Sequence, residues 1–124
     1  NRNLVSNLDL AETILDVAGR PTPDDMQGVS MLPLLRGENP PDWRKSFYYH
    51  YYEKGTHHVA PHRGVRTNLY TLAHFYETGE WELFDLRKDP HQMHSVYADE
   101  AYQTTVTELK AELERLRRLY KDAA

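Results

Sequence analysis

The chain has 124 residues, of which 40% are hydrophobic and 27% charged, a composition typical of one small packed domain and not of a disordered tail. A formal net charge of −4 argues against a nucleic-acid partner, because phosphate contacts require a clustered excess of Lys and Arg. The chain has no cysteine, which excludes disulfides, thiolate metal sites and a cysteine nucleophile. It has no apolar run long enough to span a bilayer and begins with no signal-peptide pattern, so we expect no membrane partner.

A short helix is predicted over residues 8–18, with one apolar face. Its apolar positions recur at helical spacing: Leu10, Ile14, Val17 and Ala18. The candidate N-caps are Ser6, Asn7 and Asp9, and Gly19 stands where a helix commonly ends. The apolar face needs a surface to cover it, and without one it would remain exposed.

A loop and a brief helical turn follow. Proline, aspartate and glycine residues predict a loop over residues 21–28, and Ser30 can cap a turn that runs to Leu35. The Pro-rich stretch 38–42 reads as a linker, so we place the domain boundary there and predict two parts, residues 1–42 and 43–124.

Four strands are predicted beyond the linker, in segments rich in aromatic and β-branched residues. The segments are 47–53, 65–67, 69–75 and 81–86. Short strands joined by short turns pair antiparallel, because parallel pairing would require long crossovers. We therefore expect a small antiparallel sheet.

The strongest periodic pattern predicts a long amphipathic helix over residues 102–120, with Asp99 as its cap. The apolar stripe could form a coiled-coil seam, but a neighbouring amphipathic sheet makes packing onto that sheet the preferred interpretation. The predicted fold class is α+β: an antiparallel sheet of about four strands against a long C-terminal helix, preceded by short helices.

The histidines and the paired aspartates are candidates for a metal site or for acid/base catalysis. Among seven histidines, His57, His58 and His62 lie close together, but they do not form a ligand set with the spacing that zinc requires, and we expect no metal site. The other histidines are expected at the surface or partly buried. Two carboxylate pairs, 24–25 and 85–89, are better explained by turns, where Asp bonds nearby backbone N–H groups.

Several motifs in order resemble the C-terminal part of a sulfatase of the alkaline-phosphatase-like superfamily. Residues 5–19 and 25–37 (D-M-Q-G-V-S-M-L-P-L-L-R-G) look like the last helices of the catalytic domain. The segments G-V-R-T at 64–67 and W-E-L-F-D-L-R-K-D-P at 81–90 resemble the C-terminal subdomain. The nearest likeness is to bacterial N-acetylglucosamine-6-sulfatase and iduronate-sulfatase-like enzymes. Glu12 departs from the pattern, because a proline is frequent there.

The resemblance implies a parent enzyme that hydrolyses sulfate esters with a formylglycine beside a calcium ion. The nucleophile motif C-S-x-P-x-R and the calcium-binding segments are absent from these 124 residues, so the chain alone is expected to be inactive. By this resemblance, residues 1–42 end the catalytic domain and 43–124 form the subdomain. The implied partners are the rest of the catalytic domain and a sulfated carbohydrate, and the isolated piece could dimerise. The compartment stays open, with a periplasmic or secreted parent as one alternative.

The same resemblance places two histidines at the substrate. His57 and His62 match loop histidines before the family's glycine, here Gly64, and are expected to line the pocket and bind a sugar hydroxyl or an anionic group. The alternative is that they only order the loop. Arg66 could bind sulfate, although its strand position favours a structural ion pair. Two rival functions remain: an interaction module that uses the C-terminal helix, and a His-based metal-binding domain.

Overall fold

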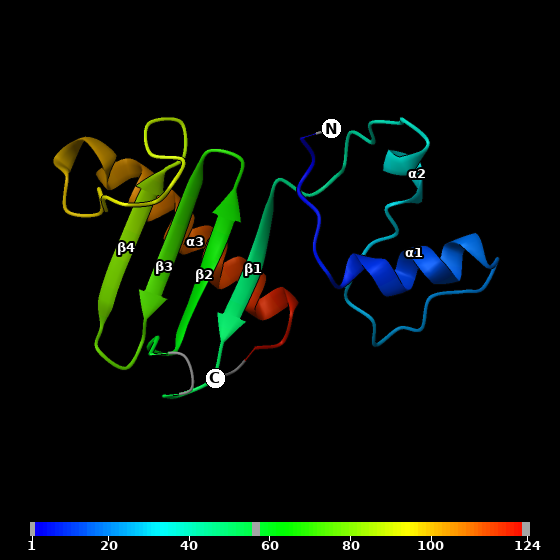
Figure 1. Cartoon of the computed structure of the whole chain (residues 1–124), viewed down its shortest axis with the longest axis horizontal. Coiled ribbons are helices and arrows are strands. Elements are labelled where there is room, and N and C mark those ends of the chain that lie inside the picture. The colour runs from blue at the N-terminus through cyan, green and yellow to red at the C-terminus, as the bar shows by residue number, and fades with distance from the viewer. Residues whose placement is uncertain (1, 56–57, 123–124) are drawn as a thin grey trace. The chain divides into compact units, whose positions relative to one another are not determined.

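The computed structural model describes residues 2–55 and 58–122 and divides the chain into two compact units, Asn1–Lys45 and Ser46–Ala124 (Figure 1). The first unit holds the helices α1 (Asp9–Val17) and α2 (Leu32–Leu35). That this unit ends a catalytic domain remains a prediction. No described helix has the length and apolar character needed to cross a membrane.

The helix α1 lies where the sequence predicts it and ends at Gly19, whose φ is +64°. Its apolar face has no cover in the structure: Leu10, Ile14 and Val17 are 55%, 68% and 67% exposed. The predicted N-caps are wrong, because Leu8 occupies that position and no side chain caps the helix. The carboxylate of Asp9 instead accepts hydrogen bonds from Arg44 and from the Val29 N–H.

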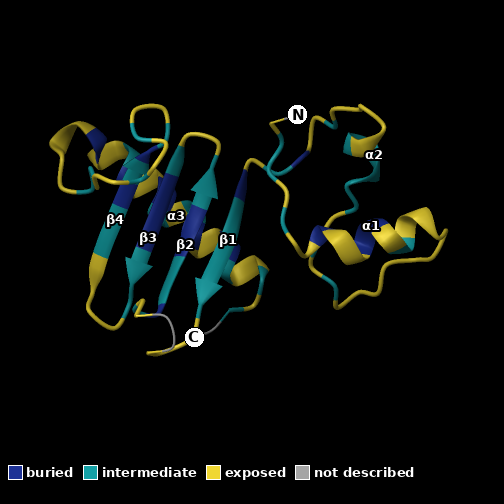
Figure 2. Cartoon of the chain, viewed as in Figure 1, coloured by how far each residue is buried: buried dark blue, intermediate teal, exposed yellow. Residues whose placement is uncertain are grey.

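Figure 2 shows buried positions on α1, and the buried residues of this helix, Asp9, Glu12 and Thr13, are all polar. Asp9 accepts two hydrogen bonds of 2.6 Å from the Arg44 guanidinium and one of 2.9 Å from the Val29 N–H. Thr13 accepts a hydrogen bond of 2.8 Å from the Met31 N–H. Glu12, where the family often has proline, accepts one of 2.6 Å from the Gly28 N–H. Polar side chains of α1 therefore satisfy the backbone of the loop that follows it.

The second unit contains a four-stranded antiparallel sheet in the order β1-β2-β3-β4. The strands are β1 (Ser46–Tyr51), β2 (His62–Thr67), β3 (Tyr70–Phe75) and β4 (Glu80–Asp85). The four predicted strands are thus confirmed, although β2 begins three residues earlier than predicted. The turn between β2 and β3 forms around the Thr67 hydroxyl, which accepts hydrogen bonds from the N–H groups of Leu69 and Tyr70.

A 3-10 turn (Glu100–Tyr102) leads into the helix α3 (Gln103–Leu119), which lies across one face of the sheet (Figure 1). The carboxylate of Asp99 accepts a hydrogen bond from the Ala101 N–H, which confirms the predicted cap. The core joins strand and helix residues: Val65, Leu72, Leu83, Tyr102, Val106, Leu109, Leu113 and Leu116. The apolar stripe of α3 therefore packs against the sheet, and the predicted α+β fold is confirmed.

Gly64 is required by close packing within the sheet. It pairs with Tyr49 on β1, whose hydroxyl donates to the Leu72 carbonyl oxygen on β3 at 3.5 Å, so the Tyr49 ring crosses β2 above the glycine. A Cβ atom at position 64 would collide with that ring and with the carbonyl oxygen of Leu72. The glycine of the G-V-R-T motif therefore has a steric reason within this unit.

Candidate functional site

The two faces of the sheet differ in what covers them. Tyr48, Val65, Leu72 and Leu83 pack against α3, so the residues between them along each strand point the other way. We call this second side the open face, because no described element of the second unit covers it. Its members are Phe47, Tyr49, Tyr51, His62, Gly64, Arg66, Thr71, Ala73, Phe75, Glu80, Glu82 and Phe84.

Of the two histidines predicted at the substrate, His57 lies outside the described residues. His62 is described, and it opens β2 on the open face, where it pairs with Tyr51 of β1. Its Nδ1 lies 2.9 Å from the Ala60 carbonyl oxygen. Because a carbonyl oxygen can only accept, Nδ1 carries the proton and Nε2 of the neutral ring is an acceptor. His62 therefore presents a defined hydrogen-bonding edge.

Aromatic rings fix the orientation of the His62 imidazole. The Tyr51 ring stacks on it with centroids 5.6 Å apart, and the Phe75 ring is tilted against it at 5.1 Å. Tyr49 adds an edge contact at 5.9 Å, and burial raises the pKa of its phenol to about 12, so this ring is neutral at physiological pH. An imidazole beside neutral aromatic rings is suited to binding a sugar. The face of an aromatic ring can pack on the C–H groups of the sugar, and the imidazole can form hydrogen bonds with the sugar hydroxyls.

Arg66 lies on the open face between Phe47 and Thr71 in the strand register. The structural ion pair that its strand position favoured is not formed within residues 2–55 and 58–122. The positive charge of Arg66 lowers the pKa of Tyr49, although burial raises this pKa by a larger amount. Arg66 therefore remains able to bind an anionic group.

A buried polar cluster on the α3 side was not predicted from the sequence. His50, expected at the surface or partly buried, is partly buried: its side chain is 3% exposed, and its Nδ1 lies 2.6 Å from Asp122 Oδ2. Asp122 also accepts a hydrogen bond from the Tyr48 hydroxyl, and burial together with this carboxylate raises the pKa of Tyr48. No local motif marks these residues, because β1 and the end of the chain meet only in the folded unit.

Two further groups, His74 and Asp85, have structural roles. His74 stacks on Trp81 at 3.9 Å, and its pKa is lowered by burial and by nearby cations, chiefly Arg63. His91 and His94 are exposed, as predicted. Asp85 accepts from Arg87 and Tyr102 and stabilises the turn after β4. Within the described part of the chain, no group of three His, Asp or Glu side chains is arranged to hold a metal ion.

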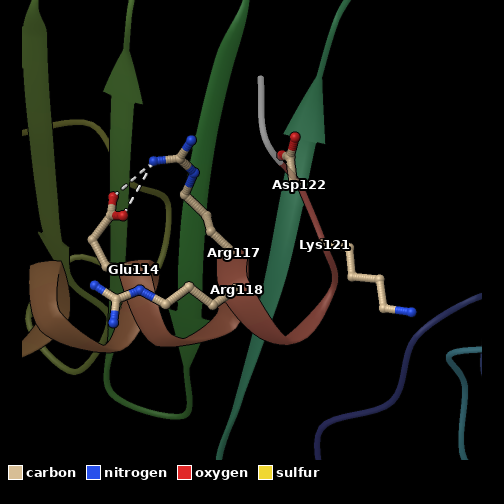
Figure 3. A pocket seen from close by; sticks show the side chains of 5 residues that line it. All are labelled: Glu114, Arg117, Arg118, Lys121 and Asp122. Carbon is tan, nitrogen blue, oxygen red and sulfur yellow. Dashed lines mark hydrogen bonds and ion pairs between the residues drawn. The ribbon is translucent and has the colours of Figure 1, made fainter.

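A hollow of about 410 Å³ lies at the C-terminal end of α3, lined by Glu114, Arg117, Arg118, Lys121 and Asp122. Figure 3 shows that Arg118 and Lys121 point away from Arg117, which is bound to Glu114 at 3.0 Å. Cations at this end of a helix stabilise its dipole. The cationic groups do not converge on one ligand, so the open face is the stronger candidate.

Comparison with known proteins is consistent with the resemblance seen in the sequence. The model of the family described as N-sulphoglucosamine sulphohydrolase, C-terminal, matches residues 1–119. An N-acetylglucosamine-6-O-sulfatase of Bacteroides thetaiotaomicron is 43% identical over 120 residues, which are 94% of this chain and 22% of that protein. A Delta 4,5-hexuronate-2-O-sulfatase of the same species is 31% identical over 86% of this chain and 22% of its own length.

The fold of this chain is also similar to part of a solved structure. A protein in complex with its substrate D-glucosamine-2-N,6-O-disulfate superposes with a TM-score of 0.88 at 42% identity. The match covers 93% of this chain and 24% of that one. The chain thus spans about a quarter or less of each of these three proteins.

Proposed function

We propose that this chain, which belongs to the N-sulphoglucosamine sulphohydrolase C-terminal family, is the accessory domain of an enzyme that hydrolyses sulfate esters of sugars. The observation that carries this proposal is the 43% identity, over 94% of the chain, to an N-acetylglucosamine-6-O-sulfatase. The substrate class favoured by this relative, and by the solved structure with a 6-O-sulfated glucosamine, is a 6-O-sulfated amino sugar.

The chain supplies part of the substrate pocket and not the bond-breaking groups. The nucleophile motif of the family is absent from its sequence, and its described residues offer no carboxylate cluster that would suit calcium. A formylglycine and a calcium ion would be held by the rest of the parent enzyme, where they would supply the nucleophile and stabilise the sulfate charge. The isolated chain is therefore inactive.

Within the pocket, His62 binds and orients the sugar. Its Nδ1 is held by Ala60, so Nε2 can accept a hydrogen bond from a sugar hydroxyl. The Tyr51 ring, stacked on the imidazole at 5.6 Å, offers an apolar surface beside that nitrogen. His57, which lies outside the described residues, is proposed to contribute as well. Both residues act in binding, and neither contacts the sulfur atom that reacts.

The role of His62 is tested in the full-length enzyme with a 6-O-sulfated N-acetylglucosamine. Replacing His62 by Ala should raise KM about 5- to 10-fold, because one hydrogen bond to the substrate is lost, with a smaller effect on kcat. His57→Ala should act in the same direction. His62→Gln keeps a side-chain acceptor and should recover part of the loss.

His91 supplies the matched control, since it is an exposed loop histidine. His91→Ala should leave KM and kcat unchanged. Unchanged KM in both His57→Ala and His62→Ala would remove these residues from the pocket and leave them with an ordering role in the loop.

A further inference from the structure

We propose that Asp122 is a positioning residue for sugar binding: through His50 it fixes the end of β1, on which the orientation of His62 depends. This inference rests on the proposed function, because it takes His62 to bind the sugar of a sulfated substrate. It adds a residue on the α3 side of the sheet that acts on the substrate only through other side chains.

The turn that ends α3 fixes the position of Asp122. The N–H of Lys121 donates to the Arg118 carbonyl oxygen at 3.2 Å, and the φ of Lys121 is +55°. The N–H of Asp122 donates to the Arg117 carbonyl oxygen at 2.9 Å. This pair of hydrogen bonds, with a left-handed residue after the cap, is the Schellman motif that ends many helices. The motif brings the Asp122 carboxylate to His50 of β1.

The imidazole of His50 joins three segments of the second unit. The side chains of His50 and Asp122 are 3% and 9% exposed, and Nδ1 lies 2.6 Å from Asp122 Oδ2. Because a carboxylate oxygen only accepts, Nδ1 donates, and Nε2 faces the Tyr76 hydroxyl at 3.2 Å in the turn after β3. Asp122 also accepts a hydrogen bond from the Tyr48 hydroxyl. A buried network with these partners holds β1 in one arrangement.

His50 is close along β1 to the strand pair that carries His62. It lies one position before Tyr51, whose pair with His62 is the last in the register of β1 and β2. The Tyr51 ring stacks on His62 at 5.6 Å, and the next ring along the chain, Tyr52, stacks on His50 at 3.7 Å. The end of β1 is therefore held on both faces of the sheet, by His50 on one and by His62 on the other.

An anchor at this place matters because strand ends open more readily than strand middles. Loss of the Asp122 contact would loosen His50 and Tyr52, and with them the last strand pair. The imidazole of His62 would then have to be ordered when the sugar binds, and ordering on binding weakens affinity. Asp122 thus preorganises His62 from the opposite side of the sheet.

Kinetics of the full-length enzyme on 6-O-sulfated N-acetylglucosamine test this role. Asp122→Ala should raise KM about 3- to 5-fold and change kcat less than about 2-fold, because substrate binding is weakened and the reacting groups are untouched. Asp122→Asn keeps an acceptor for His50, so its KM should stay close to that of the unchanged enzyme. In the His62→Ala background, Asp122→Ala should cause no further increase of KM, because it acts through His62.

Tyr52→Ala is a second variant that weakens the same anchor. The Tyr52 ring is 62% exposed, so its truncation leaves the core intact. Its KM should also rise, because the ring that stacks on His50 is lost. If Asp122→Ala does not fold, Tyr52→Ala decides, and an unchanged KM in that variant would overturn the proposal.

Two controls separate positioning from general stability. Leu83→Ala weakens the core of the same unit and should leave KM unchanged at a temperature at which the protein is folded. Arg118→Ala removes an exposed side chain from the last turn of α3 and should also leave KM unchanged. An increase of KM in Leu83→Ala equal to that in Asp122→Ala would overturn the proposal.

The ring nitrogens of His62 give a readout that does not depend on activity. Their NMR signals in the full-length protein are assigned through their loss in His62→Gln. The hydrogen bond with the Ala60 carbonyl oxygen selects the Nδ1–H tautomer, which should give way to a mixture of tautomers in Asp122→Ala.

The outcomes distinguish this inference from the proposed function. An unchanged KM in Asp122→Ala, where His62→Ala raises it, would overturn the positioning role and keep the proposed function. An undiminished effect of Asp122→Ala in the His62→Ala background would do the same. If His62→Ala itself leaves KM unchanged, the proposed role of His62 fails and the tautomer alone decides: a change in Asp122→Ala supports positioning of the ring, and no change overturns it.

Discussion

Replacing Asp9 by Ala is expected to lower the free energy of unfolding of the first unit by about 3–5 kcal/mol, because the partly buried Arg44 guanidinium is left without its counter-charge. Asp9 is fully buried and accepts hydrogen bonds from Arg44 and from the N–H groups of Ser6 and Val29. The measurement is urea unfolding followed by fluorescence of Trp43. Trp43 is the only tryptophan of this unit and becomes the sole reporter in a Trp81→Phe background.

Asp16 provides the control for Asp9. It lies on the same helix but is exposed, and its carboxylate bonds only the Ser30 hydroxyl among the contacts of the described residues. Asp16→Ala should change the free energy of unfolding by less than about 1 kcal/mol. Equal effects of the two substitutions would mean that the Asp9–Arg44 pair does not stabilise the first unit. If the unit is already unfolded in the Asp9 variant, Trp43 will report this at zero urea.

Acid should have the same effect as the Asp9 substitution. Burial alone would raise the pKa of Asp9, but the hydrogen bonds from Arg44, Ser6 and Val29 outweigh it and hold the pKa below its usual value. Since the pKa is lower in the folded state, the stabilisation is complete above about pH 3.9 and is lost as the pH falls through the folded pKa. In the Asp9→Ala variant this part of the acid dependence should disappear.

Replacing Leu83 by Ala is expected to destabilise the second unit by about 2–5 kcal/mol, because the substitution leaves a cavity between β4 and α3. Leu83 has no exposed surface and belongs to the same core cluster as Leu72 and Leu113. The measurement is urea unfolding followed by Trp81 fluorescence in a Trp43→Phe background.

The matched control for this core substitution is Leu119→Ala. Leu119 ends α3 and is 57% exposed, so its truncation should cost less than about 0.5 kcal/mol. A loss below 1 kcal/mol in Leu83→Ala would contradict the packing of α3 on the sheet. A loss of the same size in both variants would contradict the assignment of the buried face.

The fold of the second unit could be predicted from the sequence because its signals are local and consistent. Alternating residues such as Trp81, Leu83 and Asp85 mark one face of a strand, and the stripe from Tyr102 to Leu116 marks one face of a helix. These two surfaces bury each other. The beginning of β2 at His62 was missed, because the residues before Val65 have little strand preference and are held by pairing with Tyr51.

The first unit was harder to predict because its packing reverses the usual pattern. An apolar stripe predicts that α1 buries Leu10 and Ile14, yet the structure buries Asp9 and Glu12 and exposes the stripe. Loop backbone groups such as the Gly28 N–H are satisfied by these carboxylates, a need that periodicity does not reveal. The partners of His50 could not be predicted either, because Asp122 lies at the other end of the unit.

Sulfate release from 6-O-sulfated N-acetylglucosamine is to be compared between the full-length protein and the 124 residues alone. We expect turnover by the full-length protein, an increase of KM in its His62→Ala variant, and no sulfate release by the short chain at any concentration. Sulfate release by the short chain, or none from sulfated sugars by the full-length protein, would contradict it.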